Sequence, residues 1–257
     1  MKKSVWVTAL DKDEALAKEQ MDTLSKYGLA VSGHFWIDDL KKAAWLGPVE
    51  TLMAPETALW VISGKPETFA DPTVRIGLSL LSLKIQAAKG HGFNIMVRPT
   101  GGVLEQELPT PLAGATILKE SDNLGVKAAA AVNIPAKPLW GEYRLSIIAM
   151  PSVGQWFEIG PREGEWAGAL FGISGKAEID AHGVGDAGAP PERCVLNYPM
   201  QNAKLELDGT EYTAWAVKNP LDAGSSYYVR VKGAPEALVF GEMGEGDMPE
   251  LYTIKLA

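Results

Sequence analysis

The first 98 residues alternate between short apolar runs and amphipathic segments. Ala17, Met21 and Leu24 recur at helical spacing, and Gly28 closes that predicted helix. Asp11, followed by Glu14 three residues later, has the spacing of a capping box and predicts the start of the helix. The predicted strands are residues 5–10, 29–37, 58–62 and 93–97. Strands and helices that alternate in this way predict a parallel sheet covered by helices, in a flavodoxin-like arrangement.

Polar residues follow the predicted strands. Because ligands of open parallel sheets bind beyond the carboxyl ends of the strands, the residues that leave those ends are candidates for a site. We predict a ligand-binding rim from Asp11, Asp38, Ser63 and Lys65. Arg98 and Pro99 follow the fourth strand at the same rim.

The segment from Asp71 to Ala88 predicts a helix that is apolar on two sides. Asp71 and Pro72 suit the N-cap and the first helical position. A helix with this much apolar circumference needs cover beyond the sheet, from the second domain, from another copy of the chain or from burial within the monomer. We predict a homo-oligomer or protein-partner interface on one stripe, formed by Val74, Leu78, Leu81 and Ile85.

The pattern changes after residue 98. Residues 99–125 are rich in Pro and Gly and predict a connecting segment, with a further strand at residues 115–118. Residues 126–257 predict short strands without helices, in a β-sandwich or barrel. Asp208-Gly209 is the best hairpin turn. We expect residues 194–198 to form a strand, and the aromatic residues between 156 and 171 to fill the core or, if they face outward, to form a carbohydrate or peptide platform.

Composition narrows the classes of partner. The 257-residue chain carries a net charge of −8, which disfavours binding to nucleic acid or to an anionic membrane. No apolar run reaches the roughly 20 residues that a membrane span needs. Cys194 is the only cysteine and is predicted to be a free core thiol. Because a single cysteine forms no disulfide within the chain, we expect a cytoplasmic protein. We also expect the chain to start directly with its folded part, without a signal peptide.

Motifs for phosphate, metal or hydrolytic chemistry are incomplete. A P-loop fails because Pro66 replaces the hydroxyl residue and Leu59 replaces the first Gly. Residues 183–188 match a dinucleotide motif formally but predict a loop between strands. The acidic residues near the first two strands resemble the pocket of response-regulator receiver domains. The phosphorylated aspartate of such a domain is missing here, because the third strand ends in Ser63. The three histidines are far apart, and no nucleophile elbow occurs, so we predict no metal site and no cofactor.

The first 98 residues resemble a TIR-type domain. The matching segments are "VWVTALDKDEALAKEQMDTLSKYGLAV", "ALWVIS" with its final Ser63, and "FNIMVRP". The resemblance implies a flavodoxin-like sheet. Members of the family that cleave NAD carry a glutamate about a dozen residues past the Ser, where this chain has Arg75. Glu67 is the only nearby carboxylate that could replace it. Non-catalytic members act by assembling with one another.

These observations lead to two main hypotheses about function. The first is a non-enzymatic signalling or recognition protein that self-associates through the α/β domain and binds a partner or small ligand through the β domain. The second is a nucleotide-processing hydrolase of the NAD-cleaving type, with Glu67, Lys65 and Asp11 at a strand-end cleft near Ser63. A third possibility is a structural component in which neither domain has a small-molecule site.

Overall fold

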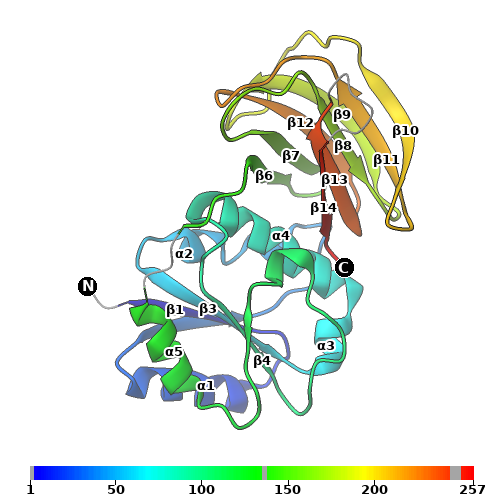
Figure 1. Cartoon of the computed structure of the whole chain (residues 1–257). Coiled ribbons are helices and arrows are strands. Elements are labelled where there is room, and N and C mark those ends of the chain that lie inside the picture. Colours follow the sequence, from blue (N-terminus) through cyan, green and yellow to red (C-terminus); the bar gives the residue numbers. More distant parts are fainter. Residues whose placement is uncertain (1–2, 135–137, 244–249) are drawn as a thin grey trace. The chain divides into compact units, whose positions relative to one another are not determined.

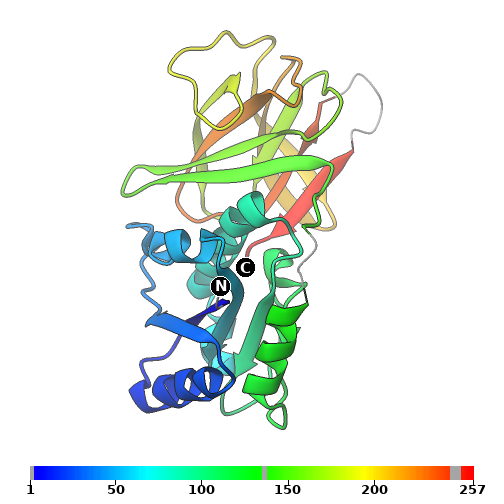
Figure 2. The same ribbon diagram turned by 90° about the vertical axis from the view of Figure 1, so that its left-hand side faces the viewer.

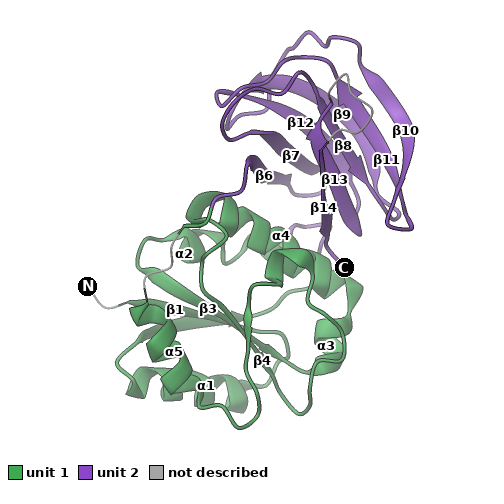
Figure 3. Cartoon of the chain, viewed as in Figure 1, with its two compact units in different colours: residues 1–39, 44–139 green, residues 40–43, 140–257 purple. Residues whose placement is uncertain are grey.

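The computed structural model describes residues 3–134, 138–243 and 250–257, and the chain divides into two compact units (Figure 1 and Figure 3). Unit 1 comprises residues 1–39 and 44–139, and unit 2 comprises residues 40–43 and 140–257. Unit 1 contains a parallel sheet with helices, and unit 2 contains antiparallel sheets. The predicted combination of an α/β part followed by an all-β part is therefore confirmed.

The sheet of unit 1 has the strand order β2-β1-β3-β4-β5, and every neighbouring pair is parallel. The chain runs from β1 to β2 on one side and then returns to the other side of β1, so the strand order reverses between β1 and β3. All carboxyl ends lie at one edge. The strands are β1 (Ser4–Ala9), β2 (Ala30–Phe35), β3 (Thr57–Gly64), β4 (Ile95–Pro99) and β5 (Thr116–Ile117).

Helices cover both faces of this sheet (Figure 1 and Figure 2). Alternate residues of each strand point to the same face, so Val5 and Val7 of β1 pack with Leu59 and Val61 of β3 against α1 and α5. The helices α2 and α4 lie on the other face. The helical elements are α1 (Glu14–Lys26), η1 (Ala44–Leu46), α2 (Val49–Met53), α3 (Pro66–Ala70), α4 (Pro72–Lys89), η2 (Thr110–Leu112) and α5 (Leu124–Asn133).

Helix α1 begins later than the sequence predicted. Its N-cap is Asp13, whose carboxylate accepts a hydrogen bond from the backbone N–H of Leu16 at 2.9 Å. The capping-box prediction for Asp11 is therefore wrong, and the carboxylate of Asp11 is free to bind elsewhere. The predicted start of α4 is confirmed, because Asp71 is its N-cap and Pro72 its first residue.

Helix α5 was missed by the sequence pattern. Its run of alanines has high helix propensity, and Asn123 caps it by accepting a hydrogen bond from the N–H of Val126 at 3.1 Å. Leu124, Ala128 and Val132 bury one side against the sheet. Unit 1 therefore runs to residue 139, whereas the sequence placed the end of the first domain at residue 98 and the start of the β-rich domain at residue 126.

The apolar stripe of α4 is buried within the chain. Relative exposure is 4% for Val74, 1% for Leu78 and 0% for both Leu81 and Ile85. On the same helix, Ser82 Oγ and Gln86 Nε2 each donate a hydrogen bond to the carbonyl of Pro111 at 2.8 Å, so the η2 segment covers part of it. These four apolar residues offer almost no surface to a partner, and the exposures favour the alternative of burial in the monomer.

Unit 2 contains two antiparallel sheets, with the strand orders β10-β11-β8-β13-β14 and β6-β7-β12-β9. The hairpin of β6 and β7 is the long green pair of strands in Figure 2. The strands are β6 (Tyr143–Met150), β7 (Gly154–Pro161), β8 (Ala169–Ile173), β9 (Glu178–Asp186), β10 (Met200–Leu207), β11 (Thr210–Val217), β12 (Ser225–Lys232), β13 (Ala237–Glu242) and β14 (Leu251–Lys255).

Aromatic side chains join the two sheets. Phe157 of β7 and Phe171 of β8 are both fully buried, with ring centroids 5.2 Å apart. Phe240 of β13 lies 6.5 Å from Phe171 and is fully buried as well. The half-buried Trp156 instead lies under the guanidinium of Arg230. The core interpretation of this aromatic segment therefore holds for its two phenylalanines.

The local predictions for unit 2 had mixed outcomes. The Asp208-Gly209 turn is confirmed, because both residues have positive φ between β10 and β11. Residues 183–186 belong to strand β9 and not to a loop. Gly183 and Gly185 have no side chain here because Pro191 packs against them, and a Cβ at either position would lie 2.9 Å from Pro191. Residues 194–198 form no strand, and Cys194 is exposed rather than in the core.

Candidate functional site

Asp11 and Lys65 meet where the strand order of unit 1 reverses. Asp11 follows β1 and Lys65 follows β3. The backbone N–H of Lys65 donates to Asp11 Oδ2 at 2.8 Å, and the hydroxyl of Thr68 donates to Asp11 Oδ1 at 2.8 Å. Asp11 therefore binds the start of α3 from a neighbouring strand end, and its carboxylate bridges the crevice in which ligands of such sheets usually bind.

Asp38 lies at the start of a different helix. The hydroxyl of Thr73, in the first turn of α4, is hydrogen-bonded to Asp38 and lies 2.7 Å from the N-cap residue Asp71. Hydrogen bonds from the side chain and backbone of Thr73 hold the pKa of Asp71 below its ordinary value. Asp38 thus supports the entry into α4 and does not join Asp11.

The other two predicted ligand contacts differ in accessibility. Ser63 is only 3% exposed, and its carbonyl accepts a hydrogen bond from the N–H of Leu10 at 2.8 Å. Lys65 is exposed and is the N-cap residue of α3. The structure therefore brings Asp11 and Lys65 together, whereas Asp38 is engaged at α4 and Ser63 is enclosed by the sheet.

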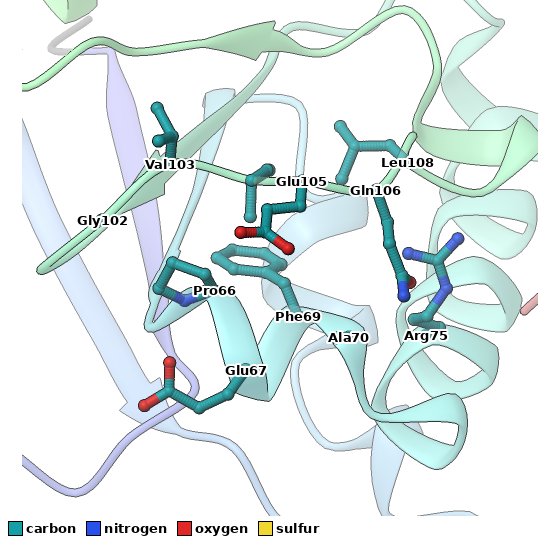
Figure 4. A pocket seen from close by; sticks show the side chains of 11 residues that line it. Pro66, Glu67, Phe69, Ala70, Arg75, Gly102, Val103, Glu105, Gln106 and Leu108 are labelled. Carbon is teal, nitrogen blue, oxygen red and sulfur yellow. The ribbon is translucent and has the colours of Figure 1, made fainter.

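A cavity of about 480 Å³ lies beside this rim, beyond the ends of β3 and β4 (Figure 4). The helix α3, the first turn of α4 and the segment that follows β4 surround it. Its volume is in the range of small-molecule sites in proteins. The lining residues are Pro66, Glu67, Phe69, Ala70, Arg75, Gly102, Val103, Leu104, Glu105, Gln106 and Leu108.

The walls of this cavity combine an apolar side with charged groups. Phe69 is 3% exposed, and Glu105 lines the same cavity (Figure 4). Gln106 extends from the same segment toward Arg75 (Figure 4). The guanidinium of Arg75 donates through Nη2 to the carbonyl of Glu107 at 2.9 Å, which fixes this segment to α4. Burial lowers the pKa of Arg75, but a guanidinium stays protonated at neutral pH.

Glu67, the candidate of the hydrolase hypothesis, also lines the cavity. It lies in the first turn of α3 and is exposed. In Figure 4 its side chain extends away from Phe69 and Glu105. The two carboxylates of the cavity therefore point in different directions.

The sequence did not single out Phe69 or residues 102–108 as site residues. Residues 102–108 show no motif and no periodicity, and the Gly and Pro around them indicated only a connection. One available signal was their position, because they directly follow the fourth strand at the rim where ligands bind.

Two other classes of feature are missing from the described part of the chain. Residues 3–134, 138–243 and 250–257 contain no group of three or more His, Cys, Asp or Glu side chains placed to hold a metal ion. Of the helices that these residues form, none is long and apolar enough to span a bilayer.

Comparisons with known proteins reveal no family. No family model matches the sequence, and no curated protein matches it. Among solved structures, ChBD3 from Thermococcus kodakarensis KOD1 matches over 43% of this chain and 93% of its own, with 8% identity and a TM-score of 0.24. ChBD2 from the same organism matches over 41% and 91%, with 8% identity and a TM-score of 0.23. Likenesses this weak carry no inference about function.

Proposed function

We propose that this chain is a non-enzymatic recognition protein that binds a small anionic molecule in the cavity of unit 1. The observation that carries the proposal is the position of Arg75 on the cavity wall. Arg75 occupies the place, about a dozen residues past Ser63, where the resemblance to TIR-type domains expects a catalytic glutamate. A guanidinium binds carboxylate or phosphate well but cannot act as a carboxylate nucleophile or base.

The arrangement of unit 1 supports this location for a ligand. The strand order β2-β1-β3-β4-β5 is that of flavodoxin-like folds, whose ligands bind beyond the carboxyl ends of the strands. Because Asp11 bridges the crevice between β1 and β3, the free space lies one strand further along, beyond β3 and β4. The proposal thus moves the small ligand from unit 2, whose two sheets suit a β-sandwich, to unit 1.

The lining indicates the chemical class of the ligand. Pro66, Phe69 and Leu108 supply apolar surface for a ring or hydrocarbon body. Arg75 suits a phosphate or carboxylate, and Glu105 suits a hydroxyl or amine that donates a hydrogen bond. A nucleotide combines a planar base, ribose hydroxyls and a phosphate, and is therefore the class we propose.

Calorimetric titration with adenosine 5′-monophosphate, and with adenosine for comparison, tests the proposal. We expect the monophosphate to bind roughly tenfold more tightly than adenosine, because only the monophosphate has an anion for Arg75. The variant Arg75→Gln removes this difference. Ala70→Phe fills the cavity and abolishes binding of both compounds, whereas Ala88→Phe, at an exposed position of α4, does not. No binding, or binding that Ala70→Phe leaves intact, would overturn the proposal.

Glu67 supports a second candidate function. It is the carboxylate near Ser63 that could replace the missing glutamate, and it lines this cavity. On this alternative the chain cleaves NAD. Incubation with NAD and chromatography of the products tests it, with Glu67→Gln as the decisive variant and Glu105→Gln as the control within the same cavity. Turnover that only Glu67→Gln removes supports cleavage. Absence of turnover in the wild-type protein eliminates it.

A further inference from the structure

Strand β2 has an open hydrogen-bonding edge. It ends the sheet of unit 1, and within the described residues it pairs only with β1. The backbone N–H groups of Ala30 and Trp36 donate to the carbonyls of Lys3 and Ala9, at 3.2 and 2.8 Å. Successive residues of a strand turn their backbone N–H and C=O groups to opposite sides. The residues between Ala30 and Trp36 therefore face β1 and the open edge in turn. Val31, Gly33 and Phe35 therefore direct their N–H and C=O groups to the open edge.

This edge lacks the devices that usually prevent pairing with another chain. Native edge strands are protected by Lys or other charged side chains, by Pro, or by bulges. The sequence of β2, Ala-Val-Ser-Gly-His-Phe, contains no Pro and no Lys, Arg, Asp or Glu, and its pairing with β1 shows no irregularity. Burial lowers the pKa of His34, so this side chain is also neutral near pH 7.

We propose that two copies of the chain pair antiparallel through β2, with a twofold axis at Gly33. The outward backbone groups determine the register. In an antiparallel pair, hydrogen-bonded positions must join residues whose groups face the partner. Only the register centred on Gly33 joins all three outward residues of β2 with one another, because Gly33 then opposes Gly33 and Val31 opposes Phe35 of the second copy. A register centred on Val31 or on Phe35 would leave outward groups of the strand unpaired.

The side chains are complementary in this register. On one face Val31 lies opposite Phe35 on each side of the Gly33 axis, so these cross-strand pairs are apolar. Ile37 follows the strand by two residues, is 64% exposed in the single chain, and in this register lies beside the start of β2 of the second copy. Cross-strand pairs of β-branched and aromatic residues stabilise antiparallel sheets. Pairing of the two copies thus covers an exposed isoleucine that the chain itself leaves in water.

The opposite face of the strand pairs polar groups. Ser32 of one copy lies opposite His34 of the other. His34 Nε2 is 3.1 Å from Thr8 Oγ1, so Nδ1 is the ring nitrogen left to form a hydrogen bond with the hydroxyl of Ser32. Both faces of the strand are therefore matched when it pairs with itself.

Charge favours the antiparallel direction and a second copy as the partner. Lys26, the last residue of α1, comes before β2, and Asp38 comes after it. Both are exposed, and Asp38 also accepts a hydrogen bond from the hydroxyl of Thr73. Antiparallel pairing brings the lysine end of each copy to the aspartate end of the other, whereas parallel pairing would place like charges together. This self-complementarity is what a twofold interface requires.

Sedimentation velocity over a concentration series tests the proposal with a pair of matched variants. Ile37→Lys places a charge beside β2, and Ile117→Lys makes the same change at the opposite edge of the sheet, on the 49% exposed residue of β5. We expect the wild-type protein and Ile117→Lys to dimerise and Ile37→Lys to raise the dimer dissociation constant by at least about tenfold. Circular dichroism of both variants verifies that they are folded.

Amide hydrogen exchange identifies the edge directly. Protection of Val31, Gly33 and Phe35 should rise with protein concentration, whereas Ser32 and His34, which face β1, should be protected at every concentration. This alternation would support pairing through β2. A protein that is monomeric throughout the series, or a dimer that Ile37→Lys leaves intact, would overturn the proposal.

Discussion

The backbone N–H of Lys65 donates a hydrogen bond to the carboxylate of Asp11, with 2.8 Å between the nitrogen and Oδ2. The sequence predicted both residues as ligand contacts, and the structure shows that they bind each other. The same carboxylate accepts a hydrogen bond from Thr68 through Oδ1. Asp11 thereby holds α3, and α3 forms one wall of the cavity, so a residue outside the cavity positions one of its walls.

We expect Asp11→Ala to destabilise unit 1 by about 1–2 kcal/mol, because it removes the acceptor of the Lys65 N–H and of the Thr68 hydroxyl. Urea unfolding followed by circular dichroism measures this loss. The control is Asp22→Ala, which removes an exposed aspartate that pairs with Lys18 on α1 and should change stability by less than about 0.5 kcal/mol. Equal losses in the two variants would show that Asp11 does not support α3.

Glu158 in unit 2 is a buried carboxylate at the centre of a hydrogen-bond network. It is 6% exposed, and its Oε1 accepts hydrogen bonds from Gly188 N–H at 2.7 Å, from Ser226 Oγ at 2.9 Å and from the Tyr228 hydroxyl at 3.2 Å. We expect Glu158→Ala to cost about 1–3 kcal/mol, because it leaves the buried hydroxyl of Ser226 without this acceptor. The hydroxyl of Tyr228, in contrast, keeps the carbonyl of Asp186 at 2.5 Å.

Glu158→Gln should lose less, since it keeps an acceptor oxygen at the same place. Glu178→Ala, at an exposed position of β9, serves as the control and should be nearly neutral. Thermal and urea unfolding of the three variants measures the differences. If Glu158→Ala proves as stable as Glu178→Ala, the network does not stabilise the unit.

The sequence predicted those features of unit 1 that depend on local periodicity. The alternation of strands and helices indicated the sheet, and the Asp71-Pro72 pair located the start of α4. Periodicity could not reveal that Asp11 would bind the start of α3, since the contact joins residues 54 positions apart. The sequence did not predict the cavity for a related reason. Residues 102–108 form a wall of it only because the folded sheet brings them beside α3.

Two errors show where local patterns mislead. Gly183 and Gly185 indicated a loop, yet they lie in β9, where the absence of side chains lets Pro191 approach the strand. The alanines of α5 form no polar and apolar stripes, so the helix was invisible to a search for amphipathic periodicity. Packing of Pro191 selects the structure at β9, whereas the helix propensity of the alanines and the Asn123 cap favour α5 without producing a stripe.

Alkaline pH should weaken unit 2 through Tyr228. Burial, followed by the nearby charge of Glu158, raises the pKa of Tyr228 to about 12. A tyrosine whose pKa is higher in the folded state favours folding below its unfolded value near 10, and this contribution is lost as pH rises toward 12. We therefore expect stability to fall above about pH 10, and to fall less steeply with pH in Tyr228→Phe. Equal slopes would contradict the assignment.

Acid pH should act on unit 2 through Asp180. Its carboxylate accepts hydrogen bonds from Arg230 Nε at 2.7 Å and from Arg230 Nη2 at 3.0 Å, and Lys232 Nζ lies 2.6 Å from Oδ2. These hydrogen bonds, with that of Arg230 the largest cause, lower the pKa of Asp180. A lowered pKa means that the stabilisation is complete above the unfolded value of about 4 and is lost as pH falls through the folded value.

We therefore expect Asp180→Asn to be less stable than the wild-type protein at pH 7. This difference in stability should shrink as the pH falls below about 4. Urea unfolding at a series of pH values measures this convergence. Glu211→Gln is the matched control, because Glu211 pairs with Lys204 at an exposed site, where a single ion pair contributes little. A stability difference for Asp180→Asn that stays constant from pH 7 to pH 3 would show that the charge of Asp180 is not what stabilises the fold.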